Sequence, residues 1–148
     1  MDNAVKTGFE INWTQQLILG LQQQIGLAYT YAQDLQRDEP LPEIAPMDIR
    51  YTLIGNYLEG KLRPELVFRH VLKQNRISNE FGETQTPSFS LFDINLQYQF
   101  TKYANISAGI NNVLDANYYE HLSRSVRGNN LPLFAPGQNA FASVNFVF

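Results

Sequence analysis

The sequence predicts an all-β fold of antiparallel, up-and-down strands that cross a membrane as part of a β-barrel. Apolar and polar residues alternate in about seven segments of roughly ten residues, which is the length a tilted membrane-crossing strand needs. A period of two places alternate side chains on opposite faces of each strand. The connections between the segments alternate between short and long, as they do in outer-membrane barrels. An odd number of strands favours a fragment of a larger barrel.

The last segment, residues 138–148, shows this pattern up to the final residue. One face carries Ala140, Ala142, Val144, Phe146 and Phe148, and the other carries Phe141, Ser143, Asn145 and Val147. In a soluble domain, such a strand is an aggregation risk unless something covers it. Contact with lipid removes that difficulty.

The preceding segments obey the same rule. Strands are expected over residues 7–13, 21–31, 48–57, 62–73, 89–100 and 105–111. In the clearest of them, Phe92, Ile94, Leu96, Tyr98 and Phe100 alternate with Asp93, Asn95, Gln97 and Gln99. Residues 34–46 are expected to be a loop because they contain three prolines, which cannot donate to a sheet ladder. Residues 74–87 and 115–137 are the other long loops, whereas 15–20, 59–60 and 101–102 are short turns.

The expected topology distributes aromatic and charged residues by depth and by face. Aromatic side chains fall near both membrane interfaces: Trp13, Tyr57, Tyr98, Phe100, Phe146 and Phe148 at the turn end, and Tyr29, Tyr31, Tyr51 and Phe92 at the loop end. His70 is expected at the outer interface. The interior face receives the charged residues Asp48, Arg50, Arg63, Glu65, Arg69 and Asp93. These groups are expected to form ion pairs with each other or with something inside the barrel.

Composition excludes several other classes of protein. The 148 residues carry a net charge of −3, which argues against nucleic acid as a partner. There is no cysteine, so disulfides and thiolate zinc sites are excluded. No catalytic motif is present, so we expect no enzyme and no cofactor. The N-terminus does not resemble a signal peptide, so we expect part of something longer or a truncated reading frame.

Two alternatives remain open at this stage. A soluble, lipocalin-like binding barrel also alternates, with its apolar face enclosed. A small self-standing outer-membrane barrel that acts as an anchor or adhesin becomes possible if one more strand lies near the N-terminus.

Residues 91–148 resemble the C-terminal region of TonB-dependent outer-membrane receptors, and the architecture of the residues before them is consistent with that family. The residues that carry the resemblance are Asn111 to Asp115, Tyr118, the Pro136-Gly137 pair and the final strand that ends at Phe148. In that family the asparagine-rich run ends the penultimate strand and opens the last extracellular loop, and Pro-Gly opens the last strand. An arginine often follows Pro-Gly there, whereas this chain has Gln138.

The resemblance implies energised import through the bacterial outer membrane. Residues 1–148 correspond to the C-terminal portion of the receptor barrel, with no plug domain, and the substrate is a metal chelate such as a ferric siderophore. The implied partners are outer-membrane lipid, the barrel assembly machinery and the chelate. The TonB complex is implied only through the absent plug and N-terminal region.

Candidate site residues lie in the last extracellular loop. Tyr119, Glu120, His121, Arg124 and Arg127 are the candidates for ligand contact, because carboxylate and imidazole suit transition metals and guanidinium binds carboxylates. The opposing interpretation is an ordinary charged loop, since two donors do not close a metal site; no metal site is therefore predicted. Val144, Phe146 and Phe148 resemble the signal that the assembly machinery recognises.

Overall fold

The computed structural model describes residues 3–123 and 132–147, and these form a single antiparallel sheet. Its strands are β1 (Ala4–Gln16), β2 (Leu21–Asp34), β3 (Glu39–Pro40), β4 (Asp48–Gly55), β5 (Leu62–Val71), β6 (Phe89–Thr101), β7 (Ala104–Asn111) and β8 (Asn139–Phe146). The described residues contain no helix, and so none long and apolar enough to cross a membrane.

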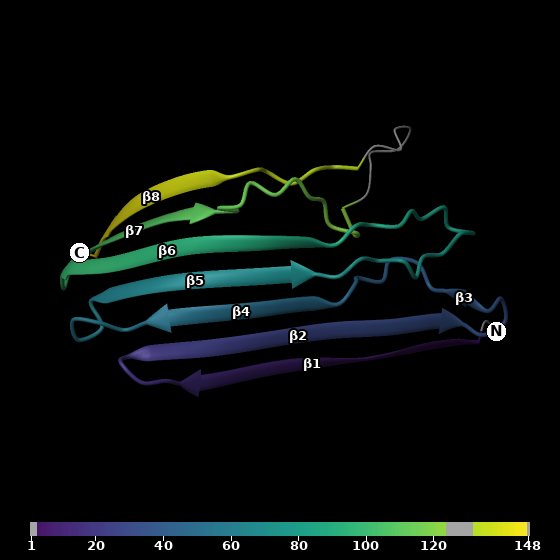
Figure 1. Ribbon diagram of the computed structural model, residues 1–148, viewed down its shortest axis with the longest axis horizontal. Helices are drawn as coiled ribbons and strands as arrows, with labels where there is room; N and C mark the ends of the chain where they lie inside the picture. Colours follow the sequence, from purple (N-terminus) through teal and green to yellow (C-terminus); the bar gives the residue numbers. More distant parts are fainter. Residues whose placement is uncertain (1–2, 124–131, 148) are drawn as a thin grey trace.

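The seven long strands lie side by side in the order β1-β2-β4-β5-β6-β7-β8, and β3 pairs only with β2. This confirms the predicted up-and-down topology. The sheet is not closed, because within the described residues β1 pairs only with β2 and β8 only with β7. Figure 1 shows one layer of strands with β1 and β8 at opposite edges. A soluble lipocalin-like barrel would instead close and enclose its apolar residues.

The connections are sorted by length between the two ends of the sheet, as predicted. Residues 17–20, 56–61 and 102–103 are the short turns, and residues 35–47, 72–88 and 112–138 are the long connections. Figure 1 shows all the short turns at one end, where β8 finishes, and all the long loops at the other, where β1 begins. We call these the turn end and the loop end.

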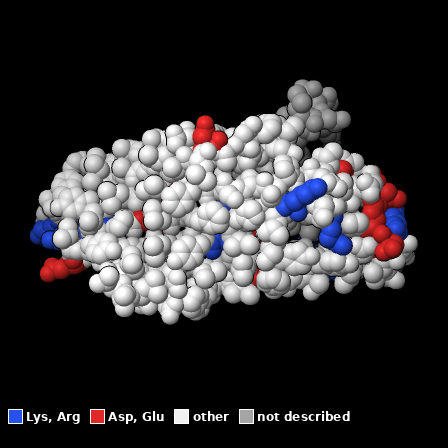
Figure 2. All heavy atoms as spheres, viewed as in Figure 1, with Lys and Arg blue, Asp and Glu red and all other residues white. Residues whose placement is uncertain are grey.

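Strand register places the apolar side chains on one face. Ile25 is opposite both Trp13 and Tyr51, and Phe68 is opposite both Tyr51 and Phe92, so one row of apolar side chains crosses five strands. These side chains are not enclosed: Trp13 is 46% exposed and Ile94 is 39% exposed. Figure 2 shows a largely uncharged band between two charged ends on the face in view. An exposed apolar face of this size suits contact with lipid.

The opposite face carries the polar set and is shaped by one glycine. The row Glu65, Asn95, Gly109 and Phe141 crosses β5 to β8. A Cβ at Gly109 would lie 2.4 Å from Asn95 Oδ1 and 2.7 Å from the Phe141 ring, so the ring covers the glycine backbone closely. An aromatic ring across a strand glycine restores the packing that the missing side chain leaves open.

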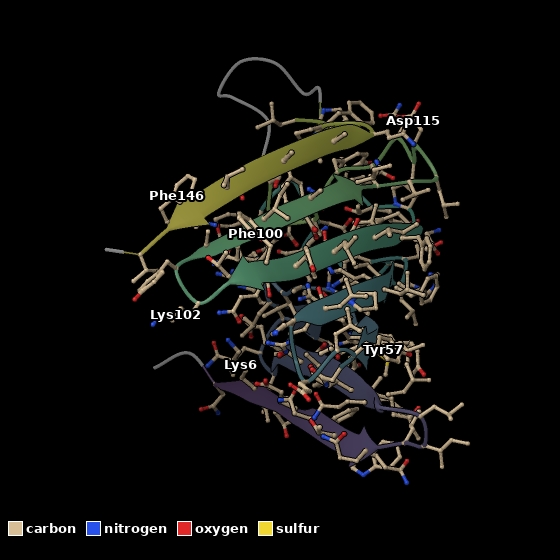
Figure 3. The ribbon with its side chains drawn as sticks, turned by 90° about the vertical axis from the view of Figure 1, so that its left-hand side faces the viewer. Lys6, Tyr57, Phe100, Lys102, Asp115 and Phe146 are labelled. Atoms are coloured by element: carbon tan, nitrogen blue, oxygen red, sulfur yellow. The ribbon has the colours of Figure 1, made fainter. Side chains whose placement is uncertain are left out.

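A second aromatic–glycine contact lies on the apolar face at the turn end. A Cβ at Gly55 would lie 2.5 Å from the Tyr57 ring, which follows β4 in the turn to β5. Figure 3 views the sheet from this end; it labels Tyr57, Phe100 and Phe146 and shows the strands rotating progressively from β1 to β8. This rotation is the usual twist of a sheet.

Several strand boundaries differ from the sequence prediction, and one strand was not expected. β2 continues to Asp34 rather than ending at residue 31, whereas β4 and β5 end two residues early, at Gly55 and Val71. β1 covers Ala4–Gln16 rather than residues 7–13, because its pairing with β2 continues over polar residues at both ends. The proline-rich segment expected to be a loop contains β3, in which Pro40 lies opposite Gln33. Proline is tolerated there because β3 pairs only with β2 and is therefore an edge strand. The ladder continues at the next residue, where Leu41 N donates to Ala32 O (3.2 Å).

Candidate ligand-binding site at the loop end

The last loop begins by folding back over the polar face of the sheet. Ala116 and Tyr118 pack against a small apolar cluster of Val71, Phe89 and Leu91. The Tyr118 and Phe89 ring centroids are 4.5 Å apart. This packing places residues 112–123 beside the inner wall at the ends of β5 and β6.

Arg69 on β5 ties the loop to this wall. Its guanidinium lies 2.6 Å from Asp48 on β4 and 2.6 Å from Glu120 in the loop, and it sits over the Phe89 ring. Burial raises the pKa of Tyr118 in the loop, and the nearby Glu120 carboxylate raises it further. The prediction that Asp48 and Arg69 share the inner face and form ion pairs is confirmed.

His121 joins the last loop to the loop before it. Its Nδ1 lies 2.8 Å from Thr86 Oγ1, its Nε2 lies 3.8 Å from Glu83, and its side chain is only 4% exposed. Glu83 also accepts hydrogen bonds from the backbone N–H groups of Glu43 (2.7 Å) and Ser78 (2.9 Å). All three long connections therefore meet around Glu83.

The other candidate residues are distributed differently. The Tyr119 ring makes an edge contact with Phe134, with centroids 5.3 Å apart, near the return to β8. Arg124 and Arg127 lie outside the described residues. The structure thus binds Glu120 to Arg69 on the wall and His121 to the preceding loop, and both side chains have protein partners. In the described ranges, no group of three or more His, Cys, Asp or Glu side chains is arranged to hold a metal ion.

The asparagine-rich run at the start of this loop forms a clasp. Asn112 has a φ of 51°, and its side chain exchanges two 2.9 Å hydrogen bonds with the backbone N–H and C=O of Ala116. Asp115 accepts a 2.9 Å bond from the backbone N–H of Gln138, whose side chain donates to the Val113 carbonyl (3.0 Å). Figure 3 shows Asp115 beside the start of β8. These bonds hold the two ends of the loop together.

Sequence reasoning noticed this motif but missed the residues that anchor the loop elsewhere. Arg69 was assigned only to the interior wall, and Glu83 and Thr86 were not singled out. Gln138, where the family often has arginine, still donates a hydrogen bond across the clasp. Of the predicted assembly signal, Val144 and Phe146 are exposed on β8, and Phe148 lies outside the described residues.

Comparison with known proteins assigns the family. A family model described as "TonB dependent receptor-like, beta-barrel" matches residues 2–113, which is well over half of the chain. The chain belongs to the TonB-dependent receptors. Members of this family are proteins of the bacterial outer membrane, and the family is one of transport receptors rather than enzymes.

Solved structures of receptors support the same architecture. The copper transporter OprC superposes with a TM-score of 0.89 at 27% identity, over 99% of this chain and 24% of OprC. The ferric yersiniabactin uptake receptor FyuA from Yersinia pestis matches with a TM-score of 0.77 at 16% identity, over 98% of this chain and 24% of FyuA. The FrpB iron transporter from Neisseria meningitidis matches with a TM-score of 0.72 at 18% identity, over 97% of this chain and 24% of FrpB. FyuA and FrpB show the fold alone.

The chain therefore spans about a quarter of the length of these receptors. A search of curated protein sequences found no match.

Proposed function

We propose that this chain forms the C-terminal portion of the barrel of a TonB-dependent receptor that imports a metal chelate, such as a ferric siderophore. Its apolar face contacts outer-membrane lipid, and its polar face lines the interior. A plug domain, which these 148 residues do not include, fills the interior and makes the contact with the TonB complex. The apolar row from Trp13 to Phe92, whose side chains are exposed or half-buried, is the observation on which this proposal depends most.

The last loop is the proposed site of ligand contact within this chain. Glu120 and His121 already have protein partners in Arg69 and Thr86, so we assign them to holding the loop over the barrel mouth. Tyr119, Arg124 and Arg127 then supply the contacts with the chelate. Guanidinium groups suit this role because they bind carboxylates bidentately.

The final strand is proposed to carry the assembly signal. Val144 and Phe146 present their side chains from the lipid side of β8 to the barrel assembly machinery, and Phe148 is the third residue of the proposed signal. The energy for import enters through the plug and the segment that precedes it, so this chain alone does not perform the coupling step.

Uptake by cells tests the transport proposal. A strain that lacks the gene is compared with its parent for uptake of a panel of radiolabelled ferric and copper chelates. We expect uptake of one anionic chelate to be lost and to require the proton-motive force. In a complemented strain, the Arg124→Gln/Arg127→Gln variant should weaken binding of that chelate about tenfold or more, whereas Arg37→Gln in another loop should not.

Two outcomes would count against the proposal. Unchanged uptake of every chelate in the panel would contradict import of a metal chelate. Uptake that persists in the presence of an uncoupler would contradict dependence on TonB.

A further inference from the structure

A cationic side chain is held on the apolar face near the loop end. The Arg76 guanidinium lies 4.2 Å from the centroid of the Tyr31 ring, and its Nη2 donates a 2.7 Å hydrogen bond to Gln33 Oε1. Tyr31 is two residues from Tyr29, whose cross-strand partner is Phe9, so register places Tyr31 on the apolar face. Arg76 is therefore fixed at the level of the aromatic girdle on the lipid side.

A hollow lies next to this arginine. It has a volume of about 180 Å³. It lies between the end of β2 and the segment that follows β5, beside the residues that precede β4. Its lining combines the cations Lys73 and Arg76 with apolar side chains, which include Ile44, Pro46 and Leu72. Figure 2 shows Lys and Arg side chains close to the loop end of the face in view.

The two cations have no carboxylate partner among the described residues. Among the nearby acids, Asp38 accepts a 3.0 Å hydrogen bond from Gln33, the residue that also accepts from Arg76. Two other acids are engaged elsewhere in the loops. Glu39 accepts hydrogen bonds from the backbone N–H groups of Asn79 and Glu80, and the Glu80 carboxylate pairs with Arg37 at 2.6 Å. Two cations without a carboxylate partner thus line the hollow, and the Arg76 guanidinium lies on its lipid side.

We propose that this hollow binds the phosphate-bearing head group of a lipid in the outer leaflet. The phosphate contacts Lys73 and the remaining donors of Arg76, and an acyl chain follows Leu72 and Tyr29 down the apolar face. Phosphate is a bidentate acceptor for guanidinium, and basic pockets at membrane-crossing segments bind anionic head groups. A stacked, hydrogen-bonded arginine loses little conformational freedom when it binds such a group.

Native mass spectrometry of the detergent-purified receptor that contains this chain tests the proposal with lipid A as the probe. The Lys73→Gln/Arg76→Gln variant should bind lipid A at least tenfold more weakly than the unchanged chain, because two surface cations are lost. Lys102→Gln removes a cation at the turn end and serves as the matched control, for which we expect unchanged affinity. Arg76→Lys keeps the charge and should retain most of the binding.

The source of the phosphate is separated by two further measurements. The unchanged protein should bind dephosphorylated lipid A as weakly as the Lys73→Gln/Arg76→Gln variant binds lipid A. Millimolar inorganic phosphate should not displace lipid A from the unchanged protein. Equal affinity for both lipid forms would overturn the proposal, as would full competition by inorganic phosphate. An affinity unchanged in the double variant, with far-UV circular dichroism like that of the unchanged chain, would also overturn it.

Discussion

Replacing Arg69 by alanine should release the last loop from the inner wall. The Arg69 side chain is 21% exposed and that of Glu120 is 35% exposed, so their contact is neither fully buried nor a surface pair. Buried charge-assisted bonds contribute about 1.5–3 kcal/mol, and exposed pairs contribute at most about 1 kcal/mol. We therefore expect the free energy of loop opening to fall by about 2 kcal/mol, since Arg69→Ala also leaves the Glu120 carboxylate unpaired beside the wall.

Amide hydrogen exchange measures this opening directly. The backbone N–H of Ser123 bonds to Glu120 O and that of Ala135 bonds to Tyr118 O, both at 2.9 Å, so both amides report on the loop. A loss of about 2 kcal/mol corresponds to roughly thirtyfold faster exchange at these amides.

The chain offers a matched control, a second Arg–Glu ion pair with the same N···O distance. Arg37 pairs with Glu80 at 2.6 Å, but these side chains are 62% and 59% exposed. Arg37→Ala should therefore change exchange in residues 112–123 by less than about twofold. Equal effects of the two substitutions, or unchanged exchange at Ser123 in Arg69→Ala, would refute the idea that Arg69 anchors the loop.

Three further changes address packing, loop closure and pH. Gly109→Ala should displace the Phe141 ring and the Asn95 amide and moderately lower the folding yield in detergent, because its Cβ would overlap both side-chain ends. Gly26→Ala, whose Cβ contacts are 3.5 Å and longer, should fold normally, and equal yields for the two variants would contradict this packing. Asn112→Ala should make the last loop more sensitive to protease, because two hydrogen bonds are lost at a positive φ, and unchanged cleavage rates would argue against the clasp. Burial favours the neutral Tyr118 phenol, so its stabilising contribution is complete below the ordinary tyrosine pKa near 10 and declines as pH rises above it. The difference in absorbance at 295 nm between the chain and Tyr118→Phe should show ionisation above that range; ionisation at or below it would contradict the burial.

The fold was predictable from sequence because its signal is local. Each strand carries its own alternation, so the apolar face could be assigned before any pairing was known. Register then confirmed the assignment, with Tyr51 opposite Phe68 and Ile25. The two-residue strand β3 was not predictable, because Glu39–Pro40 is too short for a period and contains a proline.

The site was predictable only in part because its contacts join distant segments. The sequence marked Glu120 and His121 by their chemistry, but it offered no means of pairing them with Arg69 and Thr86. Those pairs span 51 and 35 residues and depend on how the last loop folds over the wall. The clasp was visible as a motif at Asn112 and Asp115, whereas its hydrogen bonds required the structure.

The central claim is that lipid contacts the apolar face and that the polar face lines the interior. The chain contains no cysteine, so the variants Ile94→Cys and Asn95→Cys can each be labelled with a single fluorophore. The two positions are neighbours on β6 and point to opposite faces of the sheet. In bilayers that contain lipids with brominated acyl chains, the probe at position 94 should be strongly quenched and the probe at position 95 should not. Equal quenching at the two positions, or stronger quenching at position 95, would contradict the account.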